Sequence, residues 1–159
     1  MCIRDREHIG SFILEHSRRA TLECFKSLPH GTYSNSMTLD GYDVPVTLAV
    51  TLTVGPGGIK SDFTGTSGMS QFGINVPLGY AKAYACYGLK CIVAPEIPNN
   101  TASLAPFEVT APEGCILNAK HPAPVSVRHV LGHFVPDLVL GALHKCLPGK
   151  VPALSLIHI

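Results

Sequence analysis

Hydrophobic and polar residues alternate strictly from Val46 to Val54, and this is the clearest structural signal in the chain. Every second residue is a valine or leucine, and the residues between them are threonine or alanine. Because successive side chains of a strand point to opposite faces, the pattern predicts a strand with one buried face. A glycine-rich turn at 55–58 follows, so Ile59–Thr64 should return antiparallel, and Tyr33–Leu39 forms a weaker strand before the pair.

Three other segments have the pattern of helices. Glu7–Leu28 carries apolar residues at steps of three and four and ends before Pro29, because proline disfavours helical geometry in the preceding residue. Val76–Val93 is apolar on nearly all sides, which is typical of a buried helix. Val130–Leu147 is predicted to be a third helix that Pro136 kinks or begins.

The segment Ile97–His121 is rich in proline and is predicted to be extended, with short strands at Phe107–Thr110 and Cys115–Leu117. Taken together, these elements predict an α+β fold. Its core would be an antiparallel β-meander packed with one buried helix and two amphipathic helices, as part of a larger subunit.

The two ends of the chain are related at the level of DNA. One short DNA sequence encodes Met1–Asp5 in one direction and Leu154–His158 in the other, and it resembles the mosaic end used in transposon-based library preparation. We therefore expect residues 1–6 and 154–159 to be linker-derived artefacts. Residues 7–153 are then expected to be an internal piece of a longer protein.

Charge and composition narrow the classes of partner. The chain has 12 basic and 11 acidic residues, with 46% hydrophobic and only 14% charged residues. Such a balance argues against a nucleic-acid partner or an anionic membrane, since both need a basic surface. A surface poor in charge is better explained by partner subunits that cover it, with a compact monomer as the alternative.

The cysteines indicate a reducing environment. Apart from Cys2 there are five, an odd number, and no two of them have CxxC spacing: Cys24, Cys86, Cys91, Cys115 and Cys146. Neither a disulfide framework nor a zinc knuckle is indicated. We expect buried thiols in a cytoplasmic protein. The longest apolar stretch contains Lys82 and Lys90, so it is not predicted to span a membrane.

The loop from Asp62 to Gly68 is the first candidate site. It contains a carboxylate, three hydroxyls and two glycines, including Thr66, and it follows a predicted strand. Backbone N–H groups of such a loop can approach an anion or a reacting amide. The alternative is a turn held by side-chain hydrogen bonds to its own backbone. The loop lacks the lysine-ended glycine pattern of a phosphate-binding P-loop.

Three asparagines flank the predicted buried helix. Asn75 could cap its first turn, with Pro77 just inside the helix. Asn99 and Asn100 follow Pro98, so they indicate a turn, with contact to a ligand as the alternative.

The segment around Arg128 has two interpretations. An arginine after a proline-rich strand can bind a carboxylate through two parallel hydrogen bonds, or it can fix the neighbouring loop. His129, His133 and Asp137 are four residues apart, so on an unbroken helix they could hold a metal. Pro136 interrupts that helix and Arg128 would repel a cation, so structural histidines are the alternative.

Several short motifs occur in an order that resembles one family. They are LPHGTY, DGYD, VTLTVGPGGIKSDFTGTS, GINVPLGYAKAYACYGLKCIV, EIPNN, FEVTAPEGCILN, PAPVSVRH and PDLVLGALHKCLPGKVPA. Their order and spacing over about Arg18 to Ala153 resemble the hydantoinase B/oxoprolinase family.

The resemblance implies a function that the spacing alone does not show. Members form the B subunit, or the C-terminal half, of ATP-dependent enzymes that open hydantoin, N-methylhydantoin or oxoproline rings. A hydantoinase A-type ATPase partner phosphorylates the ring carbonyl, so ATP and Mg²⁺ are expected there, in a hetero-oligomer. No cofactor is expected in this segment, which alone should be inactive. The family's metal-site region lies upstream, where a divalent metal would bind.

The resemblance assigns no catalytic residue within this segment. Its substrate-binding candidates are residues that lie in the matching motifs: Asp62, Thr66, Asn75, Asn99 and Arg128. Two alternatives stay open. The segment could belong to the large subunit of an acetone-carboxylase-like ketone carboxylase, or to a non-catalytic scaffold for the ATPase partner.

Overall fold

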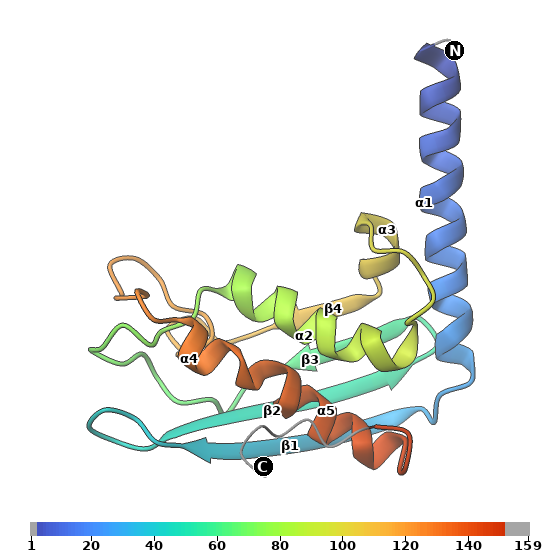
Figure 1. Ribbon diagram of the computed structural model, residues 1–159. Helices are drawn as coiled ribbons and strands as arrows, with labels where there is room; N and C mark the ends of the chain where they lie inside the picture. The colour runs from blue at the N-terminus through green and yellow to red at the C-terminus, as the bar shows by residue number, and fades with distance from the viewer. Residues whose placement is uncertain (1–2, 152–159) are drawn as a thin grey trace.

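A four-stranded sheet forms the base of the molecule in the computed structural model, which describes residues 3–151 (Figure 1). The strands are β1 (Gly31–Leu39), β2 (Val46–Gly55), β3 (Gly58–Asp62) and β4 (Phe107–Thr110), in that spatial order. The first three form the antiparallel meander that the sequence predicts, and β4 pairs with β3 in parallel. The α+β class is confirmed.

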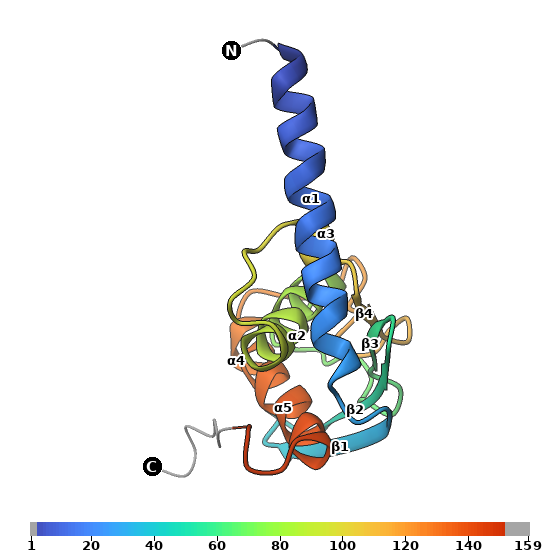
Figure 2. The same ribbon diagram turned by 90° about the vertical axis from the view of Figure 1, so that its right-hand side faces the viewer.

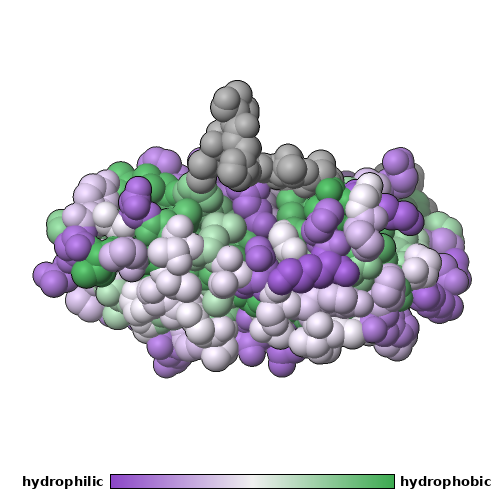
Figure 3. Space-filling model, turned by 90° about the horizontal axis from the view of Figure 1, so that it is seen from below, coloured by the Kyte–Doolittle hydropathy of each residue, from purple (hydrophilic) through white to green (hydrophobic). Residues whose placement is uncertain are grey.

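β2 has the alternating burial that its sequence predicts. The five valine and leucine side chains from Val46 to Val54 are at most 4% exposed, whereas the threonines between them are half-buried or exposed. Burying each such aliphatic side chain contributes roughly 1.5–3 kcal/mol, so this face anchors the sheet to the core. Seen from below, the middle of the molecule has the pale colours of residues with intermediate hydropathy (Figure 3).

Two helices cover the buried face of the sheet. α2 (Leu78–Val93) and α5 (Phe134–Cys146) lie side by side, with α5 over β1 and β2 and with α2 towards β4 (Figure 1). Gly88 is at their contact: a Cβ added there would lie 3.1 Å from Cγ2 of Val139 and 3.2 Å from Cα of Pro136. The absence of a side chain at Gly88 therefore sets how closely the two helices pack.

Pro136 does not kink a single long helix. The predicted helix Val130–Leu147 is divided into α4 (His129–Gly132) and α5, which meet at His133. Pro136 lies in the first turn of α5, where a backbone N–H would have no partner within the helix, so proline is tolerated.

α1 (Ile3–Lys26) projects away from the rest of the molecule (Figure 2). Its C-terminal part packs beside α3 (Thr101–Leu104), while Ile9, Phe12 and Ile13 are 50–59% exposed. Part of the apolar stripe predicted for this helix therefore faces solvent. No helix within residues 3–151 is long and apolar enough to cross a membrane.

β4 is parallel to its neighbour because the chain passes through α2 and α3 before it returns to the sheet. The strand predicted at Cys115–Leu117 is wrong, because Cys115 forms only one isolated bridge, to Gly68. Of the expected linker residues, Ile3–Arg6 form the first turn of α1, and 154–159 lie outside the described residues.

The start of β3 packs closely against Pro106, just before β4. Gly58 has a φ of +144°, and a Cβ there would lie 2.1 Å from the carbonyl oxygen of Pro106. The same oxygen accepts a 3.0 Å hydrogen bond from Ile59 N. We expect Gly58→Ala to lower the free energy of unfolding by roughly 2 kcal/mol or more, measured by urea denaturation.

Gly57 provides the matched control. Its φ is not positive, and a Cβ there would meet nothing within 4 Å. Gly57→Ala should change the free energy of unfolding by less than about 0.5 kcal/mol. Equal losses in the two variants would show that the contact with Pro106 does not limit residue 58.

Candidate functional site

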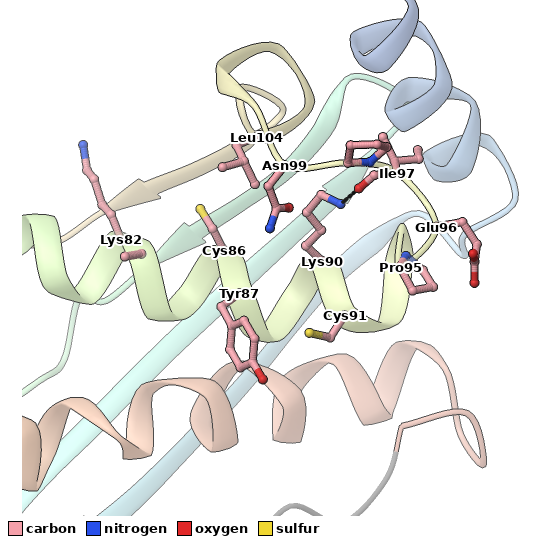
Figure 4. A pocket seen from close by; sticks show the side chains of 12 residues that line it. Lys82, Cys86, Tyr87, Lys90, Cys91, Pro95, Glu96, Ile97, Asn99 and Leu104 are labelled. Atoms are coloured by element: carbon pink, nitrogen blue, oxygen red, sulfur yellow. Dashed lines mark hydrogen bonds between the residues drawn. The ribbon is translucent and has the colours of Figure 1, made fainter.

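A cavity of ligand size lies between α2 and the segment 95–104 (Figure 4). Its volume is about 680 Å³, within the range of small-molecule sites. We call it the Lys90 cavity. Lining side chains come from both walls: Lys82, Ala83, Cys86 and Lys90 from α2, and Glu96, Ile97, Asn99 and Leu104 from the segment 95–104.

Lys90 is buried at the side of this cavity, with only 6% of its surface exposed. Its Nζ donates to the carbonyl oxygen of Ala94 at 2.9 Å and also to that of Ile97. These bonds hold the turn after α2 against the end of the helix. Within residues 3–151, no ion pair joins Lys90 to a carboxylate.

Cys86 and Asn99 provide the other polar atoms at the centre of the cavity wall. Burial raises the pKa of the Cys86 thiol, and the positive charge of Lys82 opposes this increase only in part. The thiol is therefore neutral near pH 7 and a poor nucleophile. Asn99 is exposed, and its side chain points from the loop towards α2, between Cys86 and Lys90 (Figure 4).

Most of the other predicted site residues lie elsewhere, in two segments that we call the paired loops, residues 62–76 and 112–128. Backbone hydrogen bonds join them: Ile116 N donates to Ser67 O at 2.8 Å, and Val127 N donates to Gly73 O at 2.9 Å. The structure therefore brings Asp62, Thr66, Asn75 and Arg128 onto one framework and leaves Asn99 in the Lys90 cavity.

Asn75 connects the paired loops through its side chain. Its Oδ1 accepts from Ser70 N at 2.8 Å, and its Nδ2 donates to the carbonyl oxygens of Ser70, Phe72 and Pro124, each at 2.9 Å. The residue is completely buried. The interpretation of Asn75 as a helix cap is wrong, because α2 begins at Leu78, its N-cap residue is Pro77, and no side chain caps it.

Asp62 and Thr66 both bond within the protein. One carboxylate oxygen of Asp62 accepts from the backbone N and the hydroxyl of Thr64, at 3.0 and 2.7 Å. Thr66 Oγ1 bonds to both the N and the O of Ala49, each at 3.1 Å, so it continues the hydrogen bonding along β2. The loop therefore has the side-chain-supported turn that was the alternative interpretation of its sequence.

Arg128 lies beside a group of aromatic rings. It is exposed, and its Nη1 donates to the carbonyl oxygen of Val125 at 3.3 Å. Tyr80 and Tyr84 stack with ring centroids 4.5 Å apart. Burial and a hydrogen bond with Tyr84 raise the pKa of Tyr80, while the charge of Arg128 acts in the opposite direction. The guanidinium group thus remains accessible to an anion.

The histidines are close, but they lack a third ligand of the predicted kind. The ring centroids of His129 and His133 are 6.0 Å apart, and the helix divides at His133, before Asp137. Among the residues that the structure describes, no three His, Cys, Asp or Glu side chains group as a metal site. Burial raises the pKa of Asp137, so its carboxyl group loses its proton at a higher pH than that of an exposed aspartate.

Sequence reasoning missed Lys90 as a site residue. From the sequence, Lys90 was used only as evidence against a membrane-spanning helix. The available signal was a lysine within an otherwise apolar helix, because lysine is almost never buried unless its ammonium group is satisfied. Its acceptors could not be foreseen, since they depend on how the turn at 94–98 folds.

Two asparagines allow a direct test of structural and surface roles. Asn75→Ala would leave Ser70 N and three carbonyl groups without their partner, so the free energy of unfolding should fall by roughly 2–4 kcal/mol. Asn99→Ala, on an exposed side chain, should change it by less than about 0.5 kcal/mol. Chemical denaturation of both variants decides this, and similar stabilities would contradict the role given to Asn75.

Comparisons with known proteins extend over most of the chain. A 5-oxoprolinase 1 of Arabidopsis thaliana is 33% identical over 124 residues, which are 74% of this chain and 10% of that protein. A candidate B subunit of a D-/L-hydantoinase from Pseudomonas sp. (strain NS671) is 30% identical over 155 residues, 89% of this chain and 26% of that protein. The chain thus spans about a quarter or less of these relatives.

Solved structures share the fold. The ATP-dependent caprolactamase from Pseudomonas jessenii aligns with a TM-score of 0.84 and 18% identity, over 93% of this chain and 26% of that one. A nucleotide-free acetone carboxylase aligns with a TM-score of 0.76 and 16% identity, over 87% and 21%.

The sequence model of the hydantoinase B/oxoprolinase family matches residues 6–158. The match confirms the resemblance drawn from the ordered motifs, and it covers both the paired loops and the Lys90 cavity. The chain belongs to the hydantoinase B/oxoprolinase family.

Proposed function

We propose that this chain is part of the B subunit of an ATP-dependent hydrolase that opens hydantoin or oxoproline rings. The family match over residues 6–158 carries the proposal. Relatives named for hydantoinase and oxoprolinase are 30% and 33% identical to the chain, whereas the acetone carboxylase is related at 16%. A ketone carboxylase is therefore the second candidate. A scaffold without catalytic residues is the other alternative.

ATP and Mg²⁺ would bind to a hydantoinase A-type ATPase partner. The loop from Asp62 to Gly68 lacks the phosphate-binding pattern, and two of its side chains already bond within the protein. Asp62 bonds to Thr64, and Thr66 bonds to Ala49. A divalent metal would be held by a part of the larger protein outside this chain. The ATP-dependent partner supplies an activated ring carbonyl.

The paired loops would support one wall of the substrate site. Their backbone hydrogen bonds and the buried Asn75 hold the segment before Arg128 in place. The exposed guanidinium could then bind the carboxylate of oxoproline through two hydrogen bonds without moving the backbone. Asp62, at the end of β3, would support the same wall through its turn.

The whole subunit with its ATPase partner tests the proposed reaction. We expect ATP hydrolysis coupled to the opening of hydantoin or 5-oxoproline rings. Chromatography of the ring-opened product would measure it. The 159-residue chain alone should give neither reaction. ATP-dependent consumption of acetone and bicarbonate instead would favour the carboxylase, and no turnover with an intact partner would favour the scaffold.

Arg128 can be tested by comparing two substrates in that complete enzyme. Arg128→Lys keeps the charge and loses the planar fork, so kcat/KM for 5-oxoproline should fall about tenfold or more. Unsubstituted hydantoin has no carboxylate, so its kcat/KM should change less. Arg19→Lys, on the exposed surface of α1, is the matched control.

Asp62→Asn completes the comparison because it keeps the shape and removes the charge. Its oxygen can still accept from Thr64, so the fold should persist. A fall in kcat by about tenfold would place the charge of Asp62 in the substrate wall. If both variants fold normally and keep turnover within about threefold, Asp62 and Arg128 are structural and the substrate binds elsewhere.

A further inference from the structure

We infer that the Lys90 cavity binds a small monocarboxylate that has an apolar body. This site is separate from the wall that carries Arg128, and the inference does not depend on the proposed ring-opening reaction. It rests on a buried ammonium group without a carboxylate partner, beside a cavity of ligand size, with apolar groups in the same wall.

The buried positive charge of Lys90 needs compensation. Moving an ammonium group out of water is costly unless hydrogen bonds and an opposite charge compensate it. Lys90 is 94% buried, and its Nζ has two carbonyl acceptors, Ala94 O and Ile97 O. A lysine ammonium has three N–H donors, so one remains for a further acceptor.

No carboxylate of the described chain supplies the missing charge. The three ion pairs found within residues 3–151 join other side chains, all of them exposed. Glu96 is the acidic residue of the cavity lining, but its side chain points away from Lys90 (Figure 4). A bound anion would therefore complete both the hydrogen bonding and the charge balance of Lys90.

The rest of the lining selects the kind of anion. The amide of Asn99 can donate one more hydrogen bond, whereas the side chain of Lys82, about two turns away on the same helix, points away from Lys90 (Figure 4). Leu104, Ile97 and Ala83 are apolar. A phosphate dianion would need several charged donors and would leave oxygens against these apolar groups. A monocarboxylate with a short aliphatic chain satisfies the amine and fills the apolar part.

Titration of the 159-residue chain with hexanoate and with its neutral amide, hexanamide, tests the inference. Isothermal calorimetry should show hexanoate binding about tenfold or more tightly than hexanamide, because only the carboxylate pairs with Lys90. In amide NMR spectra the shifted resonances should belong to the second half of α2 and to residues 94–104. Inorganic phosphate should not compete.

Three variants separate the cavity from general charge effects. Lys90→Met keeps the length of the side chain and removes its charge, so the preference for hexanoate should disappear. Because that change also loses the bonds to the turn, Ala83→Trp provides a second test: Ala83 is exposed at the cavity, and tryptophan would fill it. Hexanoate should then bind at least about tenfold more weakly, with the melting temperature unchanged.

Lys60→Met is the matched control for charge. Lys60 is exposed on β3, outside the cavity lining, and lies 3.9 Å from Glu108. It should leave hexanoate binding within about twofold. The inference is overturned if hexanoate does not bind, if hexanamide binds equally well, or if Ala83→Trp binds hexanoate like the parent chain. None of these results bears on ring opening, which needs the partner and ATP.

Discussion

The close packing of α2 against α5 at Gly88 determines where both candidate sites lie. A side chain at residue 88 would press against Val139 and Pro136, so the helices approach only because Gly88 has none. Side chains two residues apart on a helix point in nearly opposite directions, about 160° apart. With Gly88 turned towards α5, Lys90 is directed to the other flank of α2, where the cavity lies. The same contact holds Pro136 and the start of α5, next to α4 and Arg128.

The two sites differ in how completely their polar groups are satisfied. In the paired loops, Asn75 and Thr66 bond to backbone groups on several sides, so these residues make the loops rigid. In the Lys90 cavity, a buried ammonium has two acceptors and no carboxylate partner within residues 3–151. A rigid framework suits the wall of an active site, whereas an incompletely satisfied charge indicates a place for a ligand.

Local patterns predicted the elements better than their connections. The alternation in β2 depends on neighbouring residues, so both the strand and its buried face were correct. The parallel pairing of β4 depends on a crossover of more than forty residues, which no local period encodes. The third helix was predicted in the right place, and of the two roles offered for Pro136, a kink or a start, the break at His133 supports the start.

The candidate residues show the same limit. Five were chosen because they lie in family motifs, and the structure separates Asn99 from the other four. Asn75 looked like a cap because it precedes a helix, yet its bond to Pro124 spans 49 residues. Lys90 carried a charge in an apolar helix, but its importance depends on a turn that folds back over it.

The long helix α1 supports the Lys90 cavity although it lies outside its lining. Asn100 caps α3 by accepting from Ala102 N and Ser103 N, and its Nδ2 donates to Ser17 Oγ of α1 at 2.8 Å. The segment 95–104 is thus held at one end by Lys90 and at the other by α1. Ile9 and Phe12 leave the far part of α1 exposed and apolar. A protein partner that covered this part would stabilise the helix, and through Ser17 and Asn100 it would also stabilise the loop that closes the cavity.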